Sequence, residues 1–180
     1  VATPFDNESI QMLEDLDIDV IKIASCSIDD WPLLEEVSKI NKKIIISTAG
    51  ADLDVLHKVY RMFSNRKRDF SFLHCVAEYP TPASHANLRR IGFLMNEFCD
   101  IDIGFSTHES PHEKSLVPYT VAMGCKVVEK HVAIETERWG INAYSCTPQQ
   151  MELIFKDLST LNLSTYGSAT DSKKAGKWGI

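Results

Sequence analysis

Residues 20–25 read Val-Ile-Lys-Ile-Ala-Ser, an apolar run with one lysine inside it and a hydroxyl at its end. Residues 43–48, Lys-Ile-Ile-Ile-Ser-Thr, repeat that pattern. Near-continuous apolar runs of this length are typical of strands buried on both faces, and such strands belong to parallel sheets covered by helices. The two runs therefore predict a parallel α/β fold with polar side chains where the strands end.

Four more β-type runs extend the pattern along the chain. From the second run onward they recur roughly every 22 to 30 residues, the length of one strand, one helix and two loops. We expect a (β/α)8 TIM barrel, present as a fragment of about six βα units. The polar strand ends would then meet on one face, where barrel active sites lie. The six runs are 2–4, 20–24, 43–47, 70–75, 101–106 and 126–131.

Apolar residues at helical spacing fill the gaps between the runs. They predict helices over 7–16, 31–40, 52–63, 87–98 and 112–123. A further helix begins at Pro148, with Thr147 as its cap and Gln150 completing a capping box.

The chain of 180 residues, 44% of them hydrophobic, suits one domain with a sizeable core. We place a barrel domain at residues 1–160. Because the chain opens on a short run that leads straight into a helix, we expect the first barrel strands to be missing. Residues 161–180 are rich in Ser, Thr, Gly and Lys, which predicts a linker or tail.

Charge and cysteine content exclude several classes of protein. The net charge of −6 argues against a nucleic-acid partner. No apolar run approaches the roughly 18 residues that span a bilayer, so we expect no membrane partner. The five cysteines are odd in number and widely spaced, which predicts reduced thiols in a cytoplasmic protein.

Lys22 stands inside an otherwise apolar strand. Such a lysine either reaches the surface with its ammonium group or binds an anion inside the barrel. Ser25, Ser47 and Ser106, each at or beside a strand end, can converge with it. Hydroxyls beside a buried cation suit phosphate or carboxylate, which favours an anion site.

Two histidines, His108 and His131, lie 23 residues apart at the ends of successive predicted strands. A single strand-end histidine is usually structural, but two imidazoles on adjacent strands can share one divalent cation. Residues 108–112 also match HExxH, the zinc metalloprotease signature, which needs a helix. Pro111 disfavours a helix through these residues, so a protease is the least favoured interpretation and would require residues 108–112 to be helical.

Six motifs occur along the chain: TPFD (3–6), KIAS (22–25), IIST (45–48), HC with YPTP (74–75, 79–82), GFSTH (104–108) and EKH (129–131). In order and spacing they resemble the sialic acid synthase (NeuB-type) family of N-acetylneuraminate, legionaminate and pseudaminate synthases. The resemblance covers roughly residues 1–160 and implies a TIM barrel, which in the family is usually followed by an antifreeze-protein-like domain. We expect that domain to be absent from this chain.

The resemblance implies a transferase that condenses phosphoenolpyruvate with an N-acetylmannosamine-type sugar, an amino sugar. The product is a nine-carbon 2-keto sugar acid, and phosphate is released. The implied cofactor is a divalent metal, Mn²⁺ or Mg²⁺, and the full-length protein is expected to be a homodimer.

Site residues follow from the matched motifs. Lys22, Ser25, Ser47 and Ser106 would hold phosphoenolpyruvate, and His108 and His131 would bind the metal. Lys22 and the two histidines would be catalytic, and Tyr79 would lie beside the sugar.

The chain departs from the family on the sugar-facing side. The family commonly has Ser-Gly-Glu where this chain has Ser25-Cys26-Ser27, and Asn or Ser where it has Ala77. Asn142 would contact the sugar in place of a usual Asp. Neither serine nor asparagine can act as a base, which predicts a different acceptor sugar or reduced activity. The alternative is a synthase-like barrel with a binding or scaffolding role and little turnover.

Overall fold

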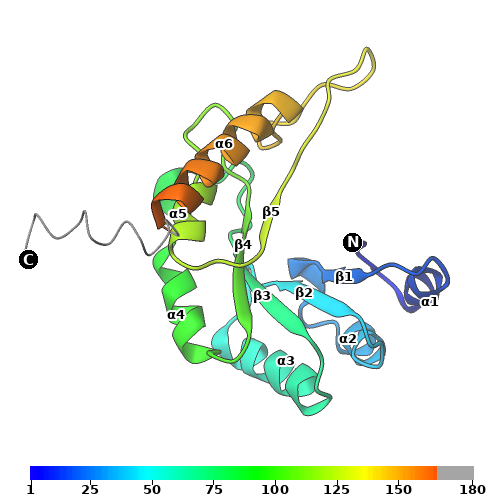
Figure 1. Cartoon of the computed structure of the whole chain (residues 1–180). Coiled ribbons are helices and arrows are strands. Elements are labelled where there is room, and N and C mark those ends of the chain that lie inside the picture. The colour runs from blue at the N-terminus through cyan, green and yellow to red at the C-terminus, as the bar shows by residue number, and fades with distance from the viewer. Residues whose placement is uncertain (166–180) are drawn as a thin grey trace, which may run out of the picture.

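The computed structural model describes residues 1–165 and the side chains of residues 1–161. Within this part the chain forms a parallel five-stranded sheet whose strand order follows the sequence. The strands are β1 (Val20–Ile23), β2 (Lys43–Ser47), β3 (Phe70–Cys75), β4 (Asp102–Thr107) and β5 (Val128–Lys130). Figure 1 shows the curved sheet with α3, α4 and α5 on one side of it. The predicted α/β barrel fragment is confirmed.

The first predicted run, residues 2–4, forms one bridge rather than a strand. Ala2 N–H donates to the Val20 carbonyl at 3.1 Å, and Lys22 N–H donates to the Ala2 carbonyl at 2.8 Å. Pro4 lacks an N–H, so the ladder cannot continue through it. A second parallel bridge, between Val132 and Cys146, lies beyond the other edge of the sheet.

The helices follow the predicted pattern with two corrections. They are α1 (Asn7–Asp15), α2 (Trp31–Val37), α3 (Leu53–Asn65), α4 (Arg89–Glu97), α5 (Val117–Ala122) and α6 (Pro148–Thr165), with short 3-10 turns η1 (Ser25–Ser27) and η2 (Ala83–His85). The helix predicted over 112–123 begins only at Val117, because a buried Glu109 accepts the N–H of Leu116 and holds the preceding loop. Residues 161–165 of the predicted linker belong to α6, and 166–180 lie outside the described residues.

The start of α6 confirms the predicted capping box. Thr147 N–H donates to Gln150 Oε1 at 2.8 Å, and Gln150 N–H donates to Thr147 Oγ1 at 3.2 Å. None of the helices in residues 1–165 has the length and apolar character that crossing a membrane requires.

Alternation along the strands divides the side chains between two faces of the sheet. Ile21, Ile23, Ile44, Ile46 and Phe72 belong to the core cluster that packs with the helices. The residues between them point to the opposite, concave side. This alternation places four polar side chains on the concave side: Lys22, Ser47, Cys75 and Ser106.

Gly104 lets β5 approach β4 closely. A Cβ at this position would lie 2.3 Å from the carbonyl oxygen of Val127 and 2.4 Å from Leu73 Cδ2. The same carbonyl accepts the N–H of Phe105 at 2.9 Å. Only glycine leaves room for that backbone contact, which fixes where the start of β5 lies relative to β4.

Candidate active site

Lys22 and Ser106 meet at one carboxylate on the concave side of the sheet. Lys22 is 8% exposed, and its Nζ donates to Glu129 Oε2 at 3.0 Å. Ser106 Oγ donates to the same oxygen at 2.6 Å. The structure therefore brings together two residues of the predicted anion site through a third, on β5, that the sequence analysis had not singled out.

Glu129 is ionised in this arrangement. Burial acts to raise its pKa, but the hydrogen bond from Ser106 and the charge of Lys22 outweigh burial and lower the pKa below its ordinary value. Glu129 could have been found from the sequence by its position two residues before His131, because residues two apart in an extended strand lie on the same face.

Cys75 connects the remaining hydroxyls to this cluster. Its sulfur lies 4.0 Å from His108 Nδ1. Burial raises the pKa of the thiol, and the hydroxyls of Ser106 and Ser25 act to lower it, so the thiol stays protonated at neutral pH. Ser25 Oγ also accepts the N–H of Ala49 at 3.1 Å. Ser47 Oγ is buried and has no hydrogen-bond partner within the described residues. An unpaired buried hydroxyl of this kind is uncommon and is expected where a ligand supplies the partner.

The two predicted histidines lie side by side. The ring centroids of His108 and His131 are 5.2 Å apart. His108 is 6% exposed, and its Nδ1 lies 4.0 Å from the sulfur of Cys75. Burial and the neighbouring His131 lower the pKa of His108, so its imidazole is neutral, which is the form that binds metals. The His131 side chain is exposed to solvent.

Two neighbouring imidazoles are a donor type that suits a divalent cation. Among the described side chains no group of three or more His, Cys, Asp or Glu residues is arranged to hold a metal. A cation bound between the two imidazoles would have further coordination positions for water or substrate.

The rings of two tyrosines contact the two histidine rings. The Tyr79 ring lies 4.4 Å from the His108 ring, and Tyr144 lies 5.0 Å from His131 and 5.3 Å from Tyr79. The loop that carries Tyr79 is tied to the end of β4, where Thr81 N–H donates to the His108 carbonyl at 3.0 Å. Tyr144 was not predicted, because its loop has no strand or helix periodicity.

The three positions that depart from the family lie in different surroundings. Ala77 is exposed, and Ser27 is buried in η1. Asn142 is exposed, and its Oδ1 accepts the N–H of Tyr144 at 3.1 Å. The Asn142 side chain therefore stabilises a turn that presents Tyr144.

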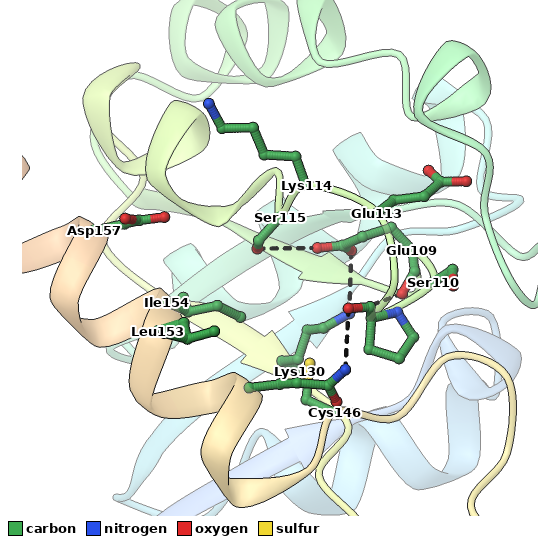
Figure 2. A pocket seen from close by; sticks show the side chains of 12 residues that line it. Glu109, Ser110, Glu113, Lys114, Ser115, Lys130, Cys146, Leu153, Ile154 and Asp157 are labelled. Carbon is green, nitrogen blue, oxygen red and sulfur yellow. Dashed lines mark hydrogen bonds and ion pairs between the residues drawn. The ribbon is translucent and has the colours of Figure 1, made fainter.

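The HExxH match is not a protease site. Residues 108–112 form no helix. Glu109 lies instead against Lys130, with Nζ–Oε2 at 3.3 Å and both side chains 2% exposed. Thr107, Ser115 and the N–H of Leu116 also donate to the Glu109 carboxylate. Figure 2 shows Glu109 and Lys130 pointing toward one another in a pocket beside α6.

We expect Glu109→Gln to lower the free energy of unfolding by about 3 kcal/mol, because it leaves the Lys130 ammonium buried without a counter-charge. Burial acts to raise the pKa of Glu109, but Thr107 and Lys130 lower it overall. The stabilisation is therefore complete above the ordinary carboxyl pKa and is lost as the pH falls through the lowered one. Urea unfolding measures it, with exposed Glu113→Gln as the control. Equal stability of the two variants at pH 7 contradicts a stabilising pair.

Comparisons with known proteins identify the family of this chain. The profile of the NeuB family matches residues 1–169. The chain is 33% identical over 158 residues to N,N'-diacetyllegionaminic acid synthase of Campylobacter jejuni, covering 86% of this chain and 46% of that protein.

Solved structures give the same result. The chain superposes on a putative spore coat polysaccharide biosynthesis protein E from Chromobacterium violaceum with a TM-score of 0.89 and 40% identity, covering 97% of this chain and 53% of that one. It superposes on an N-acetylneuraminic acid synthetase from Leptospira borgpetersenii with a TM-score of 0.86 and 28% identity, covering 97% of this chain and 62% of that one. The chain spans about half the length of the curated relatives it matches.

Proposed function

The chain belongs to the NeuB family, and we propose that it carries the phosphoenolpyruvate and metal sites of a sialic acid-type synthase. The proposed reaction joins C3 of phosphoenolpyruvate to the aldehyde carbon of an N-acetylmannosamine-type sugar. Water adds at C2, phosphate leaves, and a nine-carbon 2-keto sugar acid results. Relatives named as legionaminic and N-acetylneuraminic acid synthases support this class of product.

The observation that carries the proposal is the unpaired hydroxyl of Ser47 on the same face as a buried lysine. Ser47 is 3% exposed and lacks a partner among residues 1–161, so a bound anion would complete its hydrogen bonding. The Lys22 ammonium has three donors and gives one to Glu129, which leaves two for phosphate or carboxylate oxygens. Ser25 and Ser106 would add hydroxyl contacts.

His108 and His131 would hold Mn²⁺ or Mg²⁺. Bound there, such an ion supplies Lewis-acid polarisation of a carbonyl oxygen. Glu129 keeps Lys22 Nζ and Ser106 Oγ in fixed positions, and Lys22 holds the substrate anion in a reacting geometry. Tyr79, beside His108, would contact the acceptor sugar.

The second candidate is a barrel that binds ligands with little turnover. Ser27 and Asn142, where the family commonly has carboxylates, favour it, because neither can act as a base. A different acceptor sugar accounts for the same substitutions. Homodimer formation by the whole protein belongs to the proposal as well.

Calorimetric titration with phosphoenolpyruvate, followed by an assay of phosphate release, tests the proposed function. We expect phosphoenolpyruvate to bind, and the whole protein to release phosphate only when an N-acetylmannosamine-type sugar and Mn²⁺ or Mg²⁺ are both present. The matched control leaves out the sugar. If phosphoenolpyruvate does not bind, the proposed site is wrong. If it binds and no sugar of this type supports phosphate release, the second candidate is favoured.

A further inference from the structure

Tyr144 is the residue that contacts both histidines through its ring. Its centroid lies 5.0 Å from that of His131 at an interplanar angle of 88°, and 5.9 Å from that of His108 at 82°. Both contacts are edge-to-face, the arrangement that aromatic rings prefer. The half-buried tyrosine therefore packs against the two imidazoles at once.

Hydrogen bonds before and after Tyr144 in the sequence hold its loop in place. Asn142 Oδ1 accepts its N–H, forming a local turn of the kind that Asn commonly builds. Two residues later, Cys146 N–H donates to the His131 carbonyl at 2.9 Å, and Ala133 N–H donates to the Cys146 carbonyl at 2.9 Å. Ser145 and Cys146 are both buried, which anchors the segment beside the end of β5.

His131 needs such support more than His108 does. The ring of His108 is buried, and its Nδ1 lies 4.0 Å from the sulfur of Cys75. The ring of His131 follows a three-residue edge strand, is exposed, and has ring contacts with His108 and Tyr144. An exposed side chain without packing samples several rotamers.

We propose that Tyr144 is a positioning residue that keeps the imidazoles of His108 and His131 facing each other. The role resides in the aromatic ring rather than in the hydroxyl, because the contacts on both histidines are ring contacts. Tyr144 also packs against Tyr79 at 5.3 Å, so it links the loop after β5 to the loop after β3 across the histidines. The effect of Tyr144 on metal binding rests on the proposed function. Its effect on the orientation of the two imidazoles does not.

The experiment compares four variants: Tyr144→Ala, Tyr144→Leu, Tyr144→Phe and, as the matched control, the exposed Tyr119→Ala on α5. Mn²⁺ affinity is measured from the electron paramagnetic resonance signal of free Mn²⁺. We expect Tyr144→Ala and Tyr144→Leu to weaken binding about tenfold, as loss of a partner that orients a ligand does. Tyr144→Phe and Tyr119→Ala should bind as the unmodified protein does. Unchanged affinity in Tyr144→Ala and Tyr144→Leu overturns the proposal.

A metal-free readout separates this inference from the proposed function. The imidazole resonances of His108 and His131 are followed by NMR without Mn²⁺. We expect them to move toward free-histidine shifts in Tyr144→Ala and Tyr144→Leu, and to keep their positions in Tyr144→Phe. If the unmodified protein binds no Mn²⁺, the metal site of the proposed function fails, and these resonances alone decide the positioning role. Resonances that stay unchanged in both Tyr144→Ala and Tyr144→Leu overturn it.

Discussion

His131→Ala should reduce metal-dependent phosphate release by the whole protein at least about a thousandfold. A Lewis-acid metal contributes several kcal/mol to stabilising developing charge, and each 1.36 kcal/mol is a factor of ten in rate. His108 and His131 together form the proposed donor set, so removal of one leaves a single imidazole. The fold should survive, because His131 is exposed and lies outside the core cluster.

The matched control is His112→Ala. His112 is exposed and is the second histidine of the HExxH match, so it is the residue that a protease-type site would need. Initial rates of phosphate release are measured over a range of Mn²⁺ concentrations, together with the thermal midpoint of each variant. A His131→Ala protein that keeps its rate, or a His112→Ala protein that loses it, contradicts the assignment of the metal ligands.

The positions of β1 to β4 were predictable to within one residue at each end. Residues 43–47 and 70–75 were predicted with the boundaries that the structure shows, because their apolar runs end at a polar residue. Residues 2–4 failed as a strand at Pro4, where backbone chemistry overrides a β-type pattern. The late start of α5 depends on the buried Glu109 carboxylate, and nothing in the local sequence marks that residue as buried.

The candidate site was predictable in its location and only partly in its contacts. The polar residues at the ends of the predicted strands indicated which face carries Lys22, Ser106 and the two histidines. The Lys22–Glu129 pair joins residues 107 positions apart, and periodicity assigns a residue to a face without naming its partner there. Tyr144 reaches the histidines through a turn and one parallel bridge, features that leave no periodic signal.

Lys22→Met should weaken phosphoenolpyruvate binding at least about a thousandfold. A cation about 4 Å from an anion contributes about 4 kcal/mol at an effective dielectric constant of about 20, which corresponds to that factor. The loss includes a second effect. Without Lys22, the Glu129 carboxylate loses its ion-pair partner and faces the incoming anion with a like charge. Methionine keeps the length of the lysine stem, and the Glu129 side chain is 42% exposed, so water can solvate the carboxylate and the fold should persist.

The double variant Lys22→Met/Glu129→Gln separates these two effects. Removing the Glu129 charge as well should restore about tenfold of the affinity lost in Lys22→Met, because the repulsion disappears while the missing cation stays missing. Calorimetric titration with phosphoenolpyruvate measures each variant, with the exposed Lys114→Met as the control for loss of a lysine charge. Native affinity in Lys22→Met would remove this lysine from the anion site. Equal affinity of the single and double variants would instead assign the whole loss to the missing cation and leave Glu129 with a purely orienting role.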